Sequence, residues 1–420
     1  MAASSYEFES FRFATVLYRR CHNDAIYAAL LVGGGFVDLL FGRMRFDGGS
    51  MKTDVTKKIK VCFVVPRAYP IFNPDKGDYF GGAELDLYYL ATELTRDSSF
   101  EVSFIVADYG QNEVETIEGV TILKSLDFNK NVFDGILRTW RALKRVDADI
   151  YFLECASPGV PLVAMFCKLH RKSFMYRLAH LFETDGTYVR QHPIMGKLFN
   201  WSLRHADAVF AQNVTDEGNL TRTVGVSSRA IPNAHRLPAV QQQTRDTILW
   251  VGRDDPLKRP DRFLELARAI PDEHFTMVCQ ALNKNQHYAN LIAEAGTIPN
   301  LQFIRHVPFN QIDTYFQRAK IFVSTSDAEG FPNTFIHASK CSTAILSFAV
   351  NPDGFIDANA CGLCCNGDVA KLTYNLRFML ENSRYVEYGA NARRYAEQHH
   401  DITKIITEYK SFFTRLAKKR

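Results

Sequence analysis

The chain has 420 residues, of which 46% are hydrophobic and 23% charged, and its formal net charge is +4. These values are typical of a soluble globular protein of roughly two to three domains, and so small a net charge gives no indication of nucleic acid binding. The nine cysteines are scattered along the chain, and the pair Cys364 and Cys365 is adjacent. This argues against a disulfide framework or a zinc site and indicates a reducing, cytoplasmic compartment.

Residues 1–56 differ in character from the rest, and we predict that they form an N-terminal extension. The segment Ala25–Phe41 is apolar but is interrupted by three glycines at 33–35 and by Asp38, so it is marginal for a membrane span. Arginines lie on both sides of it, and no small-residue cleavage site of a signal peptide is evident. Three alternatives stay open: a monotopic membrane anchor, an extra helix packed on the body, or a disordered leader. Met51 is an alternative start.

Strand and helix patterns alternate through residues 57–237, which we predict to be one domain. Short apolar runs rich in β-branched and aromatic residues predict buried strands, and the segments between them carry helical periodicity. Such alternation is typical of βαβ units and a parallel sheet. The expected strands are Lys60–Pro66, Val102–Ala107, Thr121–Leu123, Ile150–Glu154 and Lys172–Ala179, with helices from Leu85 to Leu94 and over Phe133–Arg145.

Two loops of this first domain follow predicted strands and have ligand-binding chemistry. Gly81 and Gly82 precede a helix start, where backbone N–H groups and close approach would make an anion cradle. A simple helix-entry turn is the alternative. His180 comes directly after a predicted strand, at the edge where open α/β sheets bind ligands. An ordinary loop histidine is the alternative there.

Residues 238–395 are predicted to form a second domain of the same type, beginning with the polar, glutamine-rich linker Pro238–Asp246. The predicted strand Thr247–Gly252 is followed at once by Arg253 and Lys258. A planar guanidinium fork and a compact ammonium group in one strand-to-helix loop suit a diphosphate. Further strands are expected at Phe275–Cys279, Leu301–Phe303 and Ile321–Thr325, and helices near Gln311–Ala319, after Pro332 and over Tyr385–Leu416.

A polar loop and a helix that opens near Pro332 follow the last of these strands. The free N–H groups of a helix start favour an anion. Glu329 stands in the loop, and His337 lies about one turn inside the helix on the same face as Asn333 and Thr334. A phosphate at the helix tip would therefore be flanked by a carboxylate and an imidazole, which predicts a sugar-nucleotide site.

The run from Glu329 to Ala338, EGFPNTFIHA, closely resembles the signature of group 1, family 4 glycosyltransferases, which reads glutamate, seven residues, glutamate. The second glutamate is His337 here. The glycine loop and the pair of cations also resemble elements of this family, and the resemblance covers about residues 59–415. It implies an α/β fold called GT-B, in which two doubly wound Rossmann-like domains face each other across a cleft and residues 396–420 form a helix that crosses back to the first domain.

The resemblance also implies roles for individual residues. Glu329 and the amides after it contact the donor sugar, while His337 takes the ribose contact of the absent glutamate. Segment 306–309 runs past the nucleotide base, and His180 either contacts the donor sugar or orients the acceptor. The implied catalytic residues are Glu329, His180, Arg253 and Lys258, and the implied donor-binding residues are Gly81, Gly82, Arg253, Lys258, Val307, Glu329, Gly330, Phe331, Pro332, Asn333, Thr334 and His337.

The expected function is a retaining glycosyltransferase that moves a sugar, of hexosyl type, from a nucleoside diphosphate sugar to a hydroxyl of a glycan or lipid-linked acceptor. Cations and a helix dipole would stabilise the leaving diphosphate, so we expect no metal and no cofactor. No side chain must act as a covalent nucleophile, which favours same-face substitution and leaves double displacement open. We expect a cytoplasmic protein, with peripheral membrane contact as an alternative.

Two other functions fit the same resemblance. A sugar-nucleotide epimerase of this fold would need acid and base groups around the sugar ring. A degenerate, non-catalytic GT-B subunit that only binds sugar nucleotide would explain the histidine at position 337.

Overall fold

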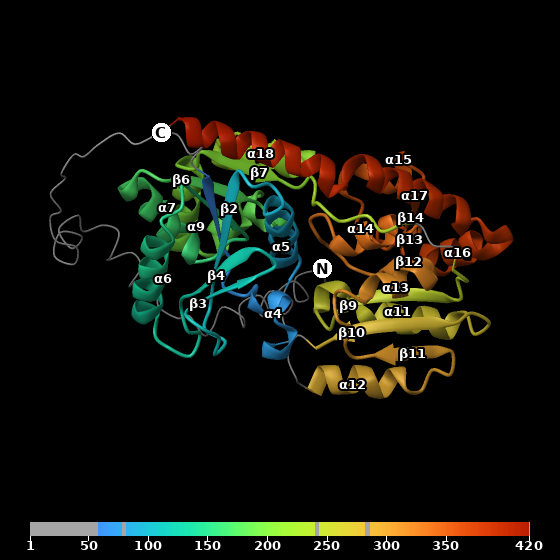
Figure 1. Ribbon diagram of the computed structural model, residues 1–420. Helices are drawn as coiled ribbons and strands as arrows, with labels where there is room; N and C mark the ends of the chain where they lie inside the picture. Colours follow the sequence, from blue (N-terminus) through green and yellow to red (C-terminus); the bar gives the residue numbers. More distant parts are fainter. Residues whose placement is uncertain (1–57, 78–80, 240–242, 282–285, 420) are drawn as a thin grey trace, which may run out of the picture.

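The computed structural model describes residues 58–77, 81–239, 243–281 and 286–419 and contains two α/β domains (Figure 1). The predictions for residues 1–56, including the apolar segment and Met51, lie outside the described residues. The two domains confirm the predicted pair of doubly wound folds, and each is built around its own sheet.

The first domain holds an eight-stranded sheet in the order β3-β4-β2-β1-β5-β6-β7-β8. Every neighbouring pair is parallel except β3 and β4, which are antiparallel. The edge strand β3 was not predicted, because its exposed, polar sequence lacks the apolar run of a buried strand. The strands are β1 (Ile59–Val64), β2 (Phe100–Val106), β3 (Val114–Ile117), β4 (Val120–Lys124), β5 (Ile150–Glu154), β6 (Ser173–Arg177), β7 (Ala208–Ala211) and β8 (Arg229–Ala230).

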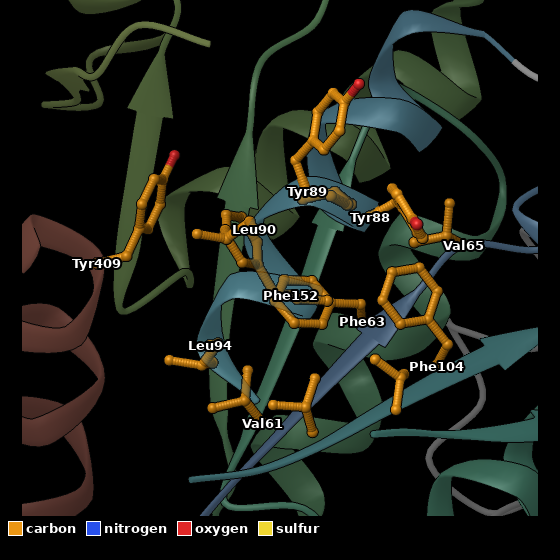
Figure 2. Packing of buried hydrophobic residues seen from close by; sticks show 14 of the residues in the cluster. Val61, Phe63, Val65, Tyr88, Tyr89, Leu90, Leu94, Phe104, Phe152 and Tyr409 are labelled. Carbon is orange, nitrogen blue, oxygen red and sulfur yellow. The ribbon is translucent and has the colours of Figure 1, made fainter. Parts of the chain in front are cut away.

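Both faces of this sheet are covered, which explains why its central strands are apolar throughout. Along β1, Val61 and Phe63 enter one core, while Cys62 and Val64 enter the other. Figure 2 shows the first of these cores, where Phe63 lies between neighbouring aromatic side chains, 5.6 Å from Phe152 between ring centroids. The helices of this domain are α4 (Tyr69–Phe72), α5 (Gly82–Leu94), α6 (Val132–Val146), α7 (Gly159–His170), α8 (Thr187–Gln191), α9 (Pro193–Arg204) and α10 (Val214–Val224).

The second domain holds a six-stranded, all-parallel sheet in the order β11-β10-β9-β12-β13-β14. Numbered within the domain, this is the order 3-2-1-4-5-6 of a dinucleotide-binding fold, and the order reverses between β9 and β12. The strands are β9 (Thr247–Arg253), β10 (Phe275–Gln280), β11 (Leu301–Ile304), β12 (Ala319–Ser324), β13 (Ala344–Ser347) and β14 (Gly362–Cys364).

Helices cover both faces of the second sheet as well. The helices of this domain are α11 (Pro260–Ala269), α12 (Gln286–Ala295), α13 (Ile312–Arg318), α14 (Asn333–Lys340), α15 (Phe355–Ala358), α16 (Val369–Leu380) and α17 (Tyr385–His399), and α18 (Ile402–Lys418) follows them along the chain. Over the described ranges of the chain, none of the helices is both long and apolar enough to cross a membrane.

The chain ends in two helices where the sequence predicted a single one over Tyr385–Leu416. The break falls at His400 and Asp401. There the backbone turns aside to exchange hydrogen bonds with His235, whose N–H donates to His400 O at 2.8 Å and whose carbonyl accepts from Ile402 N–H at 3.0 Å. The Asp401 side chain then caps the new helix. As a result α17 packs on the second domain, while α18 packs against α5, β1 and β5 of the first (Figure 1).

Candidate functional site

The predicted cations and the motif carboxylate follow the two strands between which the order of the second sheet reverses. Ligands of open α/β sheets bind outside the carboxyl ends of the strands at such a point. Arg253 is the last residue of β9, and Lys258 ends the short 3-10 helix η3 (Pro256–Lys258) behind it. Glu329 lies in the loop that follows β12. The two loops are therefore neighbours because their strands are neighbours.

Lys258 and Glu329 form a close ion pair. Lys258 Nζ lies 2.5 Å from Glu329 Oε2, and Ser326 Oγ donates to Glu329 Oε1 at 2.6 Å. Both charged side chains keep partial solvent exposure, 22% for Lys258 and 16% for Glu329. A ligand can therefore approach the two side chains. Their mutual attraction keeps both in a defined position.

The backbone around this pair is fixed by a buried hydrogen-bond chain. Trp250 Nε1 donates to Thr325 Oγ1 at 2.8 Å, and Thr325 Oγ1 donates in turn to Lys258 O at 2.6 Å. The N–H of Asp327 donates to Leu257 O at 2.9 Å. These bonds join the loop after β9 to the loop after β12, so that both move as one unit.

Two further arginines, Arg259 and Arg262, strengthen the same junction and were missed from the sequence. Arg262 Nη1 lies 2.5 Å from Asp327 Oδ1, and its guanidinium stacks 3.7 Å from the centroid of the Phe348 ring. Arg259 pairs with both Asp261 and Asp327. Nothing in the sequence distinguishes these arginines from solvated helix charges, because their partner Asp327 lies more than 60 positions away.

The start of α14 presents free backbone donors beside the ion pair. Pro332 is the N-cap residue, and the first turn closes with Phe335 N–H donating to Pro332 O at 3.0 Å. The N–H groups of Asn333 and Thr334 come before this bond, where a helix has no internal acceptor for them. Together with the helix dipole they form a site that favours an anion.

His180 of the first domain lies near Arg253, Lys258 and Glu329. His180 is an exposed residue, and its ring stacks on Phe182 with 5.0 Å between centroids. Crowding by protein atoms and the cation of Arg253 lower the pKa of His180 to about 4, while the nearby Glu329 carboxylate opposes this shift. Charges of the second domain therefore act directly on a side chain of the first. At pH 7 the imidazole is neutral, so it can accept a proton or donate a hydrogen bond.

The loop between Glu329 and α14 is interlocked with the first domain. Gly330 lies so close that a Cβ there would be 3.2 Å from Ala179 O. The N–H of Phe331 donates to Gln212 Oε1 at 3.3 Å, and its buried ring packs 5.0 Å from His400. Phe331 is thus a packing residue that sets the loop against the domain boundary.

His337 is buried and already engaged. Its Nδ1 lies 2.6 Å from Asp313 Oδ1, its ring stacks on Phe316 with 5.5 Å between centroids, and its side chain is 7% exposed. Burial would raise the pKa of Asp313, but the hydrogen bond with His337 and the charge of Lys340 lower it to about 2. Asp313, at 29%, is the more exposed partner. The ribose contact of His337 stays a prediction, and Asp313 was missed because it lies on another helix.

The remaining predicted residues lie around this centre. Gly81 is the N-cap of α5, and its N–H donates to Glu84 Oε2 at 2.8 Å. Gly82 is the first residue of α5 and faces Asn333. Val307 is half-buried and packs against the core that contains α13 and α14. Within the described ranges, no group of three or more His, Cys, Asp or Glu is arranged to hold a metal ion.

Beneath the site, the first domain contains a buried charge network that the sequence did not predict. Arg177, the last residue of β6, is 3.0 Å from Glu154 and 3.4 Å from Asp86, and it donates to Asn233 Oδ1 at 2.5 Å. Burial raises the pKa of Glu154 well above its usual value, although the Arg177 charge opposes this. Each of these four residues is at least 90% buried. The network joins the carboxyl end of the sheet to α5.

Comparison with solved structures shows the fold. The chain is similar to sucrose-phosphate synthase from Thermosynechococcus elongatus, with a TM-score of 0.71, 14% identity and coverage of 86% of this chain and 100% of that one. It is similar to Anabaena HepE in complex with UDP, with a TM-score of 0.65, 14% identity and coverage of 85% and 100%. It is also similar to an E. coli structure described as trehalose-6-phosphate bound with UDP-2-fluoro glucose, with a TM-score of 0.63, 12% identity and coverage of 85% and 99%.

Sequence comparison identifies the second domain. No curated protein matches the chain significantly. A family model described as glycosyl transferases group 1 matches residues 235–399, which contain the loop after β9, the motif loop and α14. The chain therefore has a GT-B fold, and its residues 235–399 match the family model of the group 1 glycosyl transferases.

Proposed function

We propose that the protein is a retaining glycosyltransferase that transfers a sugar from a nucleoside diphosphate sugar to a hydroxyl acceptor. One observation carries the proposal: Arg253 ends β9 at the switch point of the second sheet, and its charge acts on His180 of the first domain together with the charges of the Lys258–Glu329 pair. This arrangement combines groups that suit a diphosphate with a carboxylate that suits sugar hydroxyls.

The chemistry of the transfer requires stabilisation of a leaving diphosphate. Arg253 and Lys258 supply positive charge, and the N–H groups of Asn333 and Thr334 supply aligned dipoles. The loops that carry Lys258 and Glu329 are hydrogen-bonded to each other, so these two side chains are positioned before the ligand arrives. Since the favourable interaction grows as charge develops on the diphosphate, it lowers the barrier of transfer.

The side chains near the sugar position have distinct tasks in this proposal. Glu329 binds sugar hydroxyls while Lys258 orients its carboxylate. His180 is neutral and exposed, so its ring can orient the acceptor hydroxyl or a hydroxyl of the donor sugar. Transfer with retention then follows from same-face attack, because the leaving oxygen of the diphosphate remains beside the anomeric carbon to take the acceptor's proton.

A thermal-shift screen of UDP, GDP, ADP and their common sugars tests the first part of this proposal. A ligand that binds the folded state raises the apparent melting temperature by mass action. Two of the similar structures contain UDP or a UDP sugar, so uridine donors are tested first. Absence of any shift across all three bases at millimolar ligand would contradict a nucleotide-sugar enzyme.

Transfer assays with the selected donor test the second part. Wild type is compared with Arg253→Ala, and the anomeric configuration of the product is read by NMR. Retention in wild type and strong loss in the variant support the proposal, whereas an inverted product contradicts it. Glycan and lipid-linked acceptors are assayed separately, with and without vesicles, because the acceptor class and a peripheral membrane contact belong to the proposal.

A non-catalytic binding subunit is the second candidate, and the environment of His337 favours it. The imidazole that replaces a motif carboxylate has its Nδ1 engaged with Asp313. If wild type binds a nucleoside diphosphate but neither transfers nor hydrolyses any sugar donor, this second function holds and the first fails.

A further inference from the structure

The side chain of Asn333 joins the two domains. Its Nδ2 donates to Asp86 Oδ1 at 3.1 Å and to Gly82 O at 3.3 Å, both on α5. Its Oδ1 accepts from Asn233 Nδ2 at 3.1 Å and lies 3.0 Å from His235 Nε2. A carboxamide has two donor hydrogens and two acceptor lone pairs. All four are therefore used, and every partner lies outside α14.

The chemistry of the partners fixes the orientation of this amide. Asp86 and the Gly82 carbonyl can only accept, so Nδ2 must face them. On the other side, Nε2 of His235 must carry its hydrogen in order to donate to Oδ1. Burial lowers the pKa of His235 well below its usual value, so the ring is neutral. Rotating the Asn333 amide by half a turn would break all four bonds.

The side-chain partners of Asn333 are themselves buried, and Asp86 and Asn233 make further hydrogen bonds. Asp86 is 4% exposed and is held by Arg177, which also binds Asn233 and Glu154. The Asn233 carbonyl accepts from His400 Nδ1 at 2.8 Å. A displacement of Asn333 therefore cannot be absorbed by easy movement of its neighbours, and the hydrogen bonds break instead.

Gly82 supplies an independent sign that this contact is built into the fold. A Cβ at position 82 would lie 2.9 Å from Asn333 Nδ2, closer than real Cβ atoms approach. The residue has no left-handed backbone angle, and alanine would favour a helix more than glycine does. The glycine is therefore required by the approach of Asn333 and not by the helix.

We infer that Asn333 is a positioning residue: its side chain couples the phosphate-facing start of α14 to α5, so that closure of the two domains sets the donor-binding N–H groups in place. Its backbone contributes an N–H to the anion site, while its side chain holds the first domain against that site. The inference rests on the proposed function for its consequence on donor binding. The coupling of the domains stands on the four hydrogen bonds alone.

Asn333→Ala keeps the backbone N–H and removes the amide. We expect a smaller closed fraction of the free protein, and an apparent affinity lowered in proportion to that fraction. Loss of these hydrogen bonds should raise the dissociation constant of UDP, and the KM of a UDP sugar, about tenfold. Turnover at saturating donor should stay within about twofold of wild type, since bound donor restores closure. A fall in kcat without a change in KM would overturn the inference.

Gly82→Ala disturbs the contact between Asn333 and α5 from the α5 side. It should raise the dissociation constant of UDP and the KM of a UDP sugar, because the added methyl group displaces the Asn333 amide. In the double variant the amide is gone, so Gly82→Ala should add nothing to the effect of Asn333→Ala. Gly218→Ala in α10 is the matched control, because a Cβ there meets no atom within 4 Å. Additive effects of the two substitutions would contradict a shared contact.

Small-angle scattering of the full chain without ligand separates the inference from the proposed function. Asn333→Ala and Gly82→Ala should increase the radius of gyration, whereas Gly218→Ala should not. If wild type binds none of UDP, GDP and ADP, the proposed function fails, and the scattering still decides whether Asn333 holds the domains together. Unchanged scattering in both variants would overturn the coupling.

Discussion

The two domains place charged residues at the carboxyl ends of their sheets in opposite ways. In the first domain Arg177, Glu154 and Asp86 are nearly inaccessible and bind one another. In the second, Lys258 and Glu329 lie on loops and remain partly exposed. Charges sealed from water must be paired within the protein, whereas exposed ones can exchange partners for a ligand. The first set holds the structure, and we expect the second set to do the chemistry.

Removal of the central buried cation should have the largest effect. Arg177→Met keeps much of the volume but leaves Glu154 and Asp86 as uncompensated buried carboxylates, which should lower the free energy of unfolding by about 3–5 kcal/mol. Urea denaturation measures the loss. Adding Glu154→Gln to the same chain should recover part of it, and a single variant as stable as wild type would contradict the structural role of this network.

Removal of a partly exposed cation, Arg253, should affect activity more than stability. Arg253→Ala should lower kcat/KM by about 100- to 1000-fold, the range for loss of one preorganised electrostatic contact. Arg268→Ala is the matched control, because this arginine lies on the surface of α11 and pairs with Glu294. Equal activity of the two variants would place the diphosphate elsewhere.

Glu183 offers a pH test of the first domain. It accepts N–H groups from Ala156 at 2.7 Å and Ala179 at 3.0 Å, yet burial raises its pKa from 4.5 to about 7. Between pH 4.5 and 7 the folded state therefore binds more protons than the unfolded state, and this group's contribution to stability falls as pH rises. Relative to Glu183→Gln, wild type should lose on the order of 2–3 kcal/mol across this range.

The comparison of wild type with Glu183→Gln cancels the opposite contribution of the histidines. His180 and His400 have pKa values lowered to about 4, which makes the folded state more stable as pH rises. Parallel curves of unfolding free energy against pH for the two proteins would show that Glu183 does not titrate as described.

His337 departs from the general pattern of the second domain, because it is buried and paired. His337→Glu restores the motif residue but puts a carboxylate against Asp313, so it should lower stability by about 1–2 kcal/mol. Asp313→Asn in the same chain should relieve the repulsion and restore stability. Urea curves of both variants and the double variant check this, and an undiminished stability of the single variant would exclude the His337 to Asp313 contact.

Features carried by contiguous sequence could be predicted, and features that depend on distant pairing could not. The strand, loop and helix around Glu329 were recognisable because apolar, polar and helical patterns follow one another within 28 residues. The contact of Asn333 with Asp86 spans 247 positions, and both residues look like ordinary polar helix residues. The break between α17 and α18 was missed for the same reason, since its cause is a backbone bond to His235.

The backbone passes between the domains at two points, once after His235 and once at Asp401, and these two crossings lie side by side in a short parallel β-bridge. Because the two crossings are hydrogen-bonded to each other, they act together as one hinge between the domains. Sliding of one domain along the other is suppressed because it would shear that bridge. We therefore expect the two domains to separate most on the side of the cleft that lies farthest from His235 and Asp401.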